Sequence, residues 1–280
     1  YFKNEAVNPT GSFKDRGSCV EISRAKESGF KRIVCASTGN MGASVSAYSS
    51  FNNLQCTVFT PRDARKMKIN QILSYGARVL QSNGEYTKTM DAAEYVSDNF
   101  RVMLTGDYMY RREGTKSVGL ELGEQIQSDY VFVPIGNGIL MTSCWKGLKE
   151  SKMLGFSKSL PKMVAIQAKG SSTIAADLLK SKHPIRKIDH PNTIAVAIEV
   201  GFPLDGQRTV KSIKESGGFS HTVTDKEILT AKELLAKKEG LYAEPAGASS
   251  LAGILRSKDE IEKGSKVISL VTGMALRPHL

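Results

Sequence analysis

The strongest constraint on the fold is a regular alternation of two kinds of segment along the chain. Short apolar runs of strand-like composition alternate with longer stretches in which apolar residues recur at helical spacing. Because consecutive parallel strands need a crossover between them, this alternation predicts an α/β fold whose parallel or mixed sheets are covered by helices. The expected strands lie at residues 32–37, 56–60, 77–82, 102–106, 130–136, 163–168 and 266–271.

A long helical pattern at residues 111–127 separates the first four expected strands from the last three. We expect this helix to carry the chain from one sheet to another, so that the protein has two lobes. The predicted domains are a smaller N-terminal one of residues 13–120 and a larger one of residues 121–280, which a strand within residues 1–12 joins. Ligands in such folds bind beyond the carboxyl ends of the strands, and the loops there are the places to seek site residues.

The composition narrows the class of protein. Hydrophobic residues make up 40% and charged residues 24% of the 280 positions, as in globular proteins, and no apolar run has the ~20 residues that a membrane helix needs. The net charge of +11 comes from lysines and arginines dispersed among acidic residues, which makes nucleic acid a minor hypothesis. The four cysteines lack metal-ligand spacing, so we expect no metal, free thiols and a cytoplasmic location.

The first residues, "YFKNEAV", read as a strand and include neither an initiator methionine nor a secretory leader. We therefore expect that an N-terminal segment precedes this chain in the whole protein.

The stretch "NPTGSFKDRG", residues 8–17, places a lysine at the start of an expected helix. Ser12 and Asp15 have the spacing of a capping box, with Asp in place of Glu, which predicts a helix beginning at about Phe13. Lys14 then lies in the first turn, where the positive end of the helix dipole lowers the pKa of its amine. An amine that must be neutral to attack a carbonyl gains from this position. The residues alone leave open an ordinary lysine that extends into solvent.

A glycine-containing loop, "PIGNGILMTSCWKG" at residues 134–147, follows one expected strand. Gly136 and Gly138 allow close approach of the backbone, and the helix start behind them presents N–H groups to a phosphate. The loop has neither the dinucleotide spacing nor a Walker lysine, so it favours a mononucleotide or a phosphorylated cofactor.

Two further loops carry polar groups directly after expected strands. "STGNMGAS", residues 37–44, puts hydroxyls and Asn40 before a helix start, where unpaired backbone N–H groups can bind an anion. "VTGMALR", residues 271–277, places Thr272 at a strand end, where its hydroxyl can bond a ring nitrogen. An ordinary turn or cap contains the same residue types, and this reading also stays open.

Taken in order, these segments resemble the fold-type II pyridoxal-phosphate enzymes, and among them the threonine synthases. "KNEAVNPTGSFKDRG" is similar to the lysine motif of that family, "STGNMGAS" to its asparagine loop, and "PIGNGI" with "WKGLKE" to its phosphate loop and the following helix. "YAEPAGASSLAG" and "VTGMALR" resemble its C-terminal segments, so the likeness covers nearly the whole chain. It implies a fold like that of the tryptophan synthase beta subunit, with pyridoxal 5'-phosphate as cofactor.

The resemblance also implies roles for individual residues. Lys14 is expected to form the Schiff base with the cofactor and to move protons during the reaction. Asn40 is expected to bind the phenolic oxygen of the ring, and Thr272 its pyridine nitrogen. The cofactor phosphate is expected at Gly136, Asn137, Gly138, Ile139 and Leu140, and the substrate at Ser37, Thr38, Asn40 and Arg111.

The activity that the resemblance implies is a lyase reaction of threonine biosynthesis. O-Phosphohomoserine and water are converted to threonine and phosphate by γ-elimination and β-addition, so the expected partner is a phosphorylated amino acid. Fold analogy adds a homodimer. The chain departs from the family pattern at Met41, Thr105, Gly106, Ile139 and Met274. The alternatives are a serine/threonine dehydratase, a β-replacing synthase similar to cysteine synthase, and a non-catalytic basic binding protein.

Overall fold

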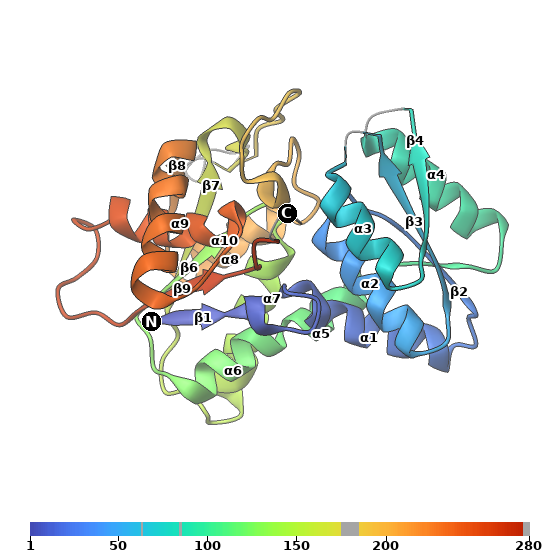
Figure 1. The fold of residues 1–280 in the computed structure, drawn as a ribbon. Coiled ribbons are helices and arrows are strands. Elements are labelled where there is room, and N and C mark those ends of the chain that lie inside the picture. The colour runs from blue at the N-terminus through green and yellow to red at the C-terminus, as the bar shows by residue number, and fades with distance from the viewer. Residues whose placement is uncertain (63, 84–85, 175–184, 277–280) are drawn as a thin grey trace. The chain divides into compact units, whose positions relative to one another are not determined.

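A computed structural model divides the chain into two compact units, each built around its own sheet (Figure 1). The larger unit contains residues 1–6 and 115–275, and the smaller unit contains residues 7–114 and, among the described residues, Leu276. Each pair of neighbouring strands in the two sheets is parallel, which confirms the predicted α/β class. Within the described part of the chain, no helix combines the length and the apolar character needed to cross a membrane. The structure describes residues 1–62, 64–83, 86–174 and 185–276.

The smaller unit is a four-stranded sheet with helices on both faces. Its elements are α1 (Lys14–Glu27), β2 (Arg32–Ala36), α2 (Asn40–Phe51), β3 (Gln55–Pro61), α3 (Lys66–Ser74), β4 (Arg78–Ser82), α4 (Tyr86–Asn99), β5 (Met103–Leu104) and α5 (Met109–Thr115). The strand order is β4-β3-β2-β5. On β2, Ile33 and Cys35 pack under α1, α2 and α3, whereas Val34 and Ala36 pack under α4. Because both faces are covered, the strand is apolar at every one of these positions and does not alternate.

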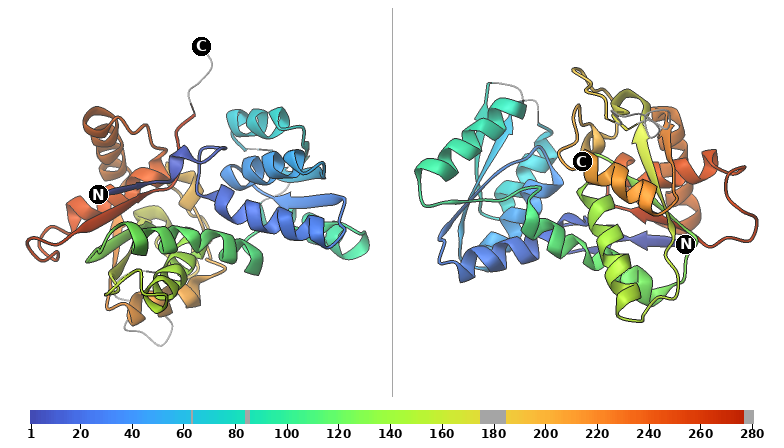
Figure 2. Two further views of the ribbon diagram at one scale, coloured as in Figure 1. Left: turned by 90° about the horizontal axis from the view of Figure 1, so that it is seen from below. Right: turned by 180° about the vertical axis from the view of Figure 1, so that it is seen from behind.

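The larger unit is a five-stranded sheet in the order β1-β9-β6-β7-β8. Its strands are β1 (Phe2–Asn4), β6 (Tyr130–Pro134), β7 (Lys162–Ala168), β8 (Ser220–Val223) and β9 (Val267–Val271). Its helices are α6 (Ser117–Gln125), α7 (Ile139–Met153), α8 (Gly206–Glu215), α9 (Asp225–Glu239) and α10 (Pro245–Arg256). The two ends of the unit meet in the sheet, since β1 runs beside β9 with Phe2 opposite Ser269 (Figure 2). Phe132 and Ile166 on the sheet pack against α9 and α10 in one apolar core.

Two glycines let α6 and α7 of the larger unit pack backbone against backbone. A Cβ atom on Gly119 would lie 2.0 Å from the carbonyl oxygen of Cys144, and one on Gly147 would lie 2.0 Å from that of Lys116. No other residue fits at such a distance. This contact sets the position of α7, the helix that begins directly after the glycine loop.

The seven strands expected from the sequence are all confirmed, with differences at their ends. The strand expected at 102–106 is only Met103–Leu104, because the chain then turns into a polar loop. The single helix expected at 111–127 is wrong, since α5 and α6 are separated at Lys116. Lys116 has helical dihedral angles (φ −59°, ψ −21°), so the interruption is one residue long. The edge strand Ser220–Val223 was not expected, because its two central residues are only half-buried.

Candidate active site

Lys14 lies in the first turn of α1, as the sequence predicts, and the helix begins at Lys14 itself, one residue after the expected start at Phe13. Its Nζ lies 3.7 Å from Oδ1 of Asp107, and its side chain is 21% exposed. The pKa of Lys14 is lowered, chiefly by burial, while the nearby Asp107 carboxylate acts in the opposite direction. The expected lowering of the pKa is therefore found. Burial replaces the helix dipole as its principal cause, because removing the ammonium from water disfavours its charged form.

The capping box expected at the start of α1 is wrong. The carboxylate of Asp15 turns back to the preceding loop, where it accepts hydrogen bonds from Thr10 N at 2.7 Å and Thr10 Oγ1 at 2.6 Å. Ser12 Oγ is buried and has no hydrogen-bond partner among the described residues. The residue before the helix, Phe13, has helical dihedral angles (φ −58°, ψ −16°) and no polar group in its side chain, so it does not cap the helix.

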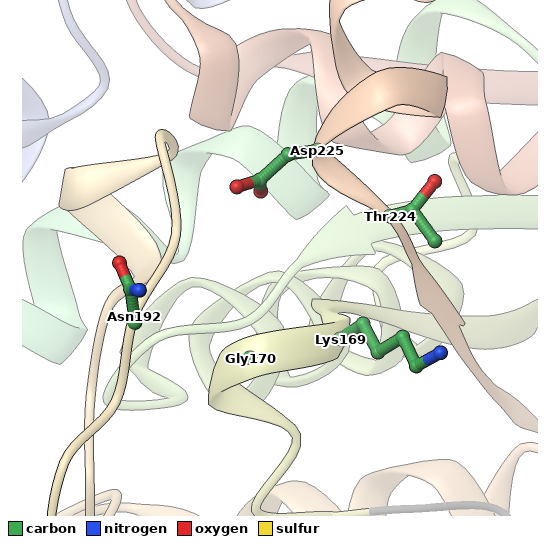
Figure 3. A pocket seen from close by; sticks show the side chains of 5 residues that line it. All are labelled: Lys169, Gly170, Asn192, Thr224 and Asp225. Atoms are coloured by element: carbon green, nitrogen blue, oxygen red, sulfur yellow. The ribbon is translucent and has the colours of Figure 1, made fainter.

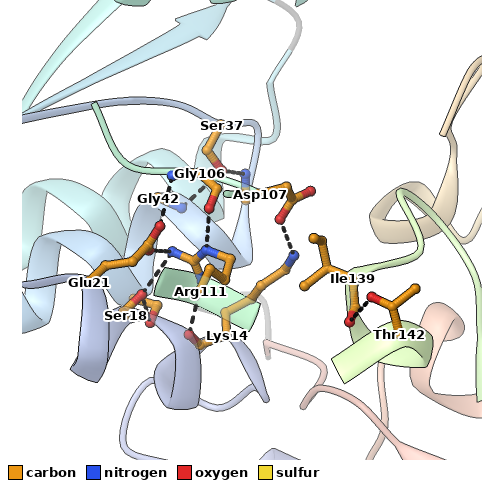
Figure 4. A network of polar contacts seen from close by, with 12 residues as sticks. Lys14, Ser18, Glu21, Ser37, Gly42, Gly106, Asp107, Arg111, Ile139 and Thr142 are labelled. Atoms are coloured by element: carbon orange, nitrogen blue, oxygen red, sulfur yellow. Dashed lines mark hydrogen bonds and ion pairs between the residues drawn. The ribbon is translucent and has the colours of Figure 1, made fainter. Parts of the chain in front are cut away.

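Arg111, on α5, lies at the centre of a network of buried polar groups in the smaller unit (Figure 4). Its Nε donates to the Gly106 carbonyl at 2.9 Å, and its Nη1 donates to the Lys14 carbonyl at 3.1 Å. Its Nη2 donates to Ser18 Oγ at 3.2 Å and to the carboxylate of Glu21, with which it forms an ion pair. The side chain is 0% exposed. Four of its five N–H donors bind groups of the protein itself, and direct contact of Arg111 with substrate, which the resemblance implied, stays a prediction.

The same network holds the loop that carries Asp107. Gly106 N donates to Glu21 at 3.1 Å, and the Gly106 carbonyl accepts from Arg111, so both polar groups of this residue are bound. Thr105 N, one residue earlier, donates to a backbone carbonyl of β2 at 2.9 Å. Burial raises the pKa of Glu21 to about 6, although the Arg111 guanidinium acts to lower it. Asp107 is the residue after Gly106, whose backbone is held at both its N–H and its carbonyl group.

The loop between β2 and α2 places the predicted substrate residues at a helix start. Ser37 Oγ accepts from Gly39 N at 3.2 Å and from Gly42 N at 2.9 Å, so it also has the ordinary capping role considered from the sequence. Thr38 is half-buried. Asn40 begins α2, and its Oδ1 accepts from the ammonium of Lys68. This contact orients the Asn40 amide.

Strand order brings two of these loops to one edge of the smaller sheet. β2 and β5 are parallel neighbours, so residues 37–40 and residues 105–107 leave the sheet at the same end. α1 packs against α2, and Ser44 Oγ on α2 donates to Ser18 Oγ on α1 at 2.7 Å. The first turn of α1 and both loops thus belong to one rigidly connected region of the smaller unit.

In the larger unit, the glycine loop after β6 forms a cradle that side chains would fill. Gly138 has φ +95°, and a Cβ atom there would lie 2.2 Å from Thr209 Oγ1. A Cβ atom on Gly136 would lie 3.2 Å from the carbonyl oxygen of Ala197. The first position requires glycine by conformation and by space, and the second favours a small residue.

Polar contacts fix this loop from the α8 side. Asp205 N donates to the Asn137 carbonyl at 2.9 Å, and the Asp205 carboxylate accepts from Thr142 Oγ1 on α7 and, at 2.9 Å, from Arg208. α7 begins at Ile139, directly after the loop. The N–H groups of a first helical turn have no partner inside the helix, so this helix start is suited to bind a phosphate.

Thr272 follows β9, the neighbour of β6 in the sheet, and is buried. Because the two strands are parallel, Thr272 and residues 136–140 leave the sheet at the same edge. A Cβ atom on Gly247 of α10 would lie 3.1 Å from Thr272 N, so α10 packs closely behind it. A glycine cradle, a helix start and a neutral hydroxyl form a donor set that fits the phosphate and ring nitrogen of pyridoxal phosphate.

Several residues of these two regions were not identified from the sequence. A signal existed for Glu21, because it lies seven residues after Lys14 and thus on the same face of α1. A signal also existed for Asp107, a carboxylate directly after an expected strand. Lys68, Asp205 and Thr209 have no local sequence signal, because their contacts are with segments distant in sequence. The residues missed are Glu21, Lys68, Asp107, Asp205 and Thr209.

An open pocket of about 450 Å³ lies beyond β7 and β8, lined by Lys169, Gly170, Asn192, Thr224 and Asp225 (Figure 3). The Asp225 carboxylate accepts from Thr193 Oγ1 and from a backbone N–H at 3.2 Å, so it anchors the adjacent loop. Thr224 caps α9. These side chains serve the local structure, and the pocket contains none of the predicted site residues.

Comparison with known proteins agrees with the arrangement of the chain. The family described as "Pyridoxal-phosphate dependent enzyme" matches residues 1–273. The chain is 38% identical to the threonine synthase of Methanocaldococcus jannaschii, over 99% of this chain and 70% of that protein. It is 37% identical to the threonine synthase of Synechocystis sp., over 99% of this chain and 72% of that protein. A solved structure of maize serine racemase has the same fold, with a TM-score of 0.85 at 24% identity, covering 99% of this chain and 83% of that one. The family resemblance seen in the sequence is confirmed, and the chain belongs to the pyridoxal-phosphate dependent enzyme family.

Proposed function

We propose that this chain is a threonine synthase, which converts O-phosphohomoserine and water to threonine and phosphate. Identities of 37–38% with two threonine synthases, over 99% of the chain, support this assignment. The observation that carries it in the structure is Lys14, an amine at a helix start whose pKa is lowered by burial. A lowered pKa gives this lysine a larger fraction of neutral, nucleophilic amine at a given pH than an exposed lysine has.

Pyridoxal phosphate, when bound, supplies an electron sink for the charge that develops on the substrate carbon. We propose that Lys14 binds the cofactor covalently and that the N–H groups at the start of α7 bind its phosphate, with Gly136 and Gly138 leaving the room for it. Asn40 donates through Nδ2 to the phenolic oxygen, since its Oδ1 is occupied by Lys68. The hydroxyl of Thr272 meets the ring nitrogen.

During the reaction, the amine of Lys14 removes protons from the α and β carbons of the substrate in turn. This step needs an unprotonated Nζ, and it is most efficient when the pKa of the amine lies near the working pH. Burial lowers the pKa of Lys14 from the high value of an exposed lysine and so moves it toward that range. Ser37, Thr38 and Asn40 bind the substrate carboxylate, because they lie together at the start of α2.

For Arg111 we propose a positioning role in place of substrate binding. Its guanidinium connects the backbone of Lys14 to Glu21 and to the loop that carries Asp107. The substrate phosphate then needs a different cation. Lys68 is the one that we propose, because its ammonium contacts Asn40 in the predicted substrate loop.

The second candidate is a serine or threonine dehydratase of the same family. The observation that favours it is the complete burial of Arg111, which removes one expected ligand of a substrate phosphate. A dehydratase uses the same lysine on a substrate without a phosphate group, so it has no need of that ligand.

The two candidates are separated by offering the purified protein, with pyridoxal phosphate, three substrates in separate reactions. Threonine and free phosphate formed from O-phosphohomoserine, with no product from threonine or phosphoserine, supports the proposal. Formation of 2-oxobutyrate from threonine, without turnover of O-phosphohomoserine, overturns it in favour of the dehydratase.

The Lys14→Ala variant tests the role of the lysine in the same assay. We expect it to lose both product formation and the visible absorption band of the bound cofactor. The matched control is Lys31→Ala, which changes an exposed lysine of the same unit and should leave both signals unchanged. A Lys14→Ala variant with full activity would rule out the assignment of this residue.

A further inference from the structure

The proposed function leaves one buried carboxylate beside Lys14 without a role. Asp107 is only 6% exposed, and its Oδ1 lies 3.7 Å from Lys14 Nζ (Figure 4). We propose that Asp107 is the charge partner of Lys14, a positioning residue whose carboxylate holds the lysine ammonium and sets the pH range in which the amine becomes neutral. The catalytic importance of this ion pair rests on the proposed function. The ion pair itself rests only on the geometry of the smaller unit.

The backbone before Asp107 is fixed more firmly than an ordinary loop. The Gly106 carbonyl accepts from Arg111 Nε at 2.9 Å and from Tyr108 N at 2.8 Å, and Gly106 N donates to Glu21 at 3.1 Å. Arg111 Nη1 at the same time donates to the Lys14 carbonyl at 3.1 Å. One guanidinium therefore holds the backbone at both ends of the pair, which explains how a carboxylate is kept beside the lysine.

Three charged groups face Lys14 in the smaller unit. The Arg111 guanidinium on α5 lowers the pKa of Lys14, whereas the carboxylates of Glu21, on α1, and Asp107, after β5, raise it. Glu21 is paired directly with Arg111, so their charges largely offset each other at Lys14. Asp107 is left as the anion that forms an ion pair with the ammonium.

Burial and Asp107 thus act on Lys14 in opposite directions. Burial alone lowers the pKa of Lys14, which makes the neutral amine a weaker base. The nearby carboxylate restores part of the proton affinity, which a proton-transferring amine requires.

The test measures the proton affinity of Lys14 without using catalysis. The full cofactor-free chain is treated with trace acetic anhydride across a pH series, and labelling of the Lys14 peptide is quantified by mass spectrometry. The exposed Lys31 in the same protein serves as internal reference. In Asp107→Asn, we expect the midpoint for Lys14 to move to lower pH by about one pH unit, because an opposite charge at this distance typically has an effect of that size.

Three variants make the result specific. Asp107→Glu keeps the charge and should stay close to the wild-type midpoint, whereas Asp107→Ser provides a second neutral variant if Asp107→Asn does not fold. Asp91→Asn removes an exposed carboxylate of the same unit and should leave the midpoint unchanged. A midpoint in Asp107→Asn and Asp107→Ser that stays within ~0.3 pH units of wild type, or moves to higher pH, overturns the proposal.

Parallel assays of threonine formation separate this inference from the proposed function. If wild type makes no threonine but the neutral variants shift the labelling midpoint, the charge pair stands and the threonine synthase assignment fails. If wild type makes threonine and the midpoint does not move, the assignment stands and the charge pair fails.

Discussion

The polar groups of the two units differ in kind. In the smaller unit, the groups that matter are charged side chains buried together: Lys14, Glu21, Asp107 and Arg111. In the larger unit, they are neutral groups, namely the N–H groups at the start of α7 and the hydroxyl of Thr272. In the function that we propose, the first arrangement sets the proton affinity of one amine, whereas the second binds the phosphate of the cofactor.

Because one unit relies on charged groups and the other on neutral groups, we expect the two units to respond to different substitutions. Buried charges are expensive to remove from water and are stable only with their partners, so the smaller unit should respond strongly to loss of one charge and to pH. Backbone N–H groups need no counter-charge but require close approach, so the larger unit should respond to added side-chain volume.

The largest effect is expected from a substitution that breaks the charged network. In Arg111→Met, the carboxylate of Glu21 loses its partner and the backbone of Lys14 loses a hydrogen bond, so the free energy of unfolding should fall by about 3–5 kcal/mol. Urea denaturation followed by circular dichroism measures this change. Arg24→Met, on the exposed face of α1, is the control and should stay close to wild type. A loss no larger than that of the control would show that the network does not stabilise the unit.

The next prediction adds volume to the glycine cradle. Gly138 (φ +95°) and Gly155 (φ +83°) have similar left-handed conformations, but only Gly138 has a neighbour in the way of a Cβ atom. Both alanine variants should lose about 1–2 kcal/mol through backbone strain. Gly138→Ala should lose about 2 kcal/mol more through overpacking, and should bind pyridoxal phosphate more weakly in an absorbance titration.

A second substitution checks the cause of this difference. Because Thr209 Oγ1 is the atom that a Cβ on Gly138 would strike, Thr209→Ala added to Gly138→Ala should recover part of the lost stability. Equal losses in Gly138→Ala and Gly155→Ala would contradict a role for close packing at the cradle.

The third prediction concerns pH. The pKa of Glu21 is raised from 4.5 to about 6 in the folded state, so the folded protein binds this proton more tightly than the unfolded chain does. The associated stability is present below pH 4.5 and is lost as pH rises through 6, by on the order of 2 kcal/mol. Glu21→Gln should lack this component when urea denaturation is repeated across the range. Glu27→Gln, with an exposed carboxylate on the same helix, should retain it, and identical pH profiles for the two variants would refute the prediction.

The smallest expected effect is at the neutral hydroxyl of the larger unit. Thr272→Val keeps the shape of the side chain and removes one hydrogen bond, so the affinity for pyridoxal phosphate should fall by about 1 kcal/mol, or several-fold. A titration followed by absorbance measures it, with the free energy of unfolding as a check on the fold. A loss of several orders of magnitude would mean that Thr272 does more than meet one ring atom.

Sequence patterns predicted the elements of both units better than their contacts. The strands around Val34 and Phe132 were found because both faces of a parallel sheet are apolar, which shows directly as continuous apolar runs. The edge strand at Ser220–Val223 was missed because half-burial leaves no such run. The capping box at Ser12 was wrong because the same spacing also allows Asp15 to bond the preceding loop.

The sequence by itself determined the alternation of strands and helices, the place of Lys14 at a helix start, and the glycine loop, because each depends on backbone preferences of neighbouring residues. Only the tertiary structure decided that Asp107 lies beside Lys14, that the side chain of Arg111 is buried, and that Thr209 packs against Gly138. These contacts join segments that are distant along the chain. They depend on the order of strands in each sheet and on how helices pack over it, which no local pattern of residues specifies.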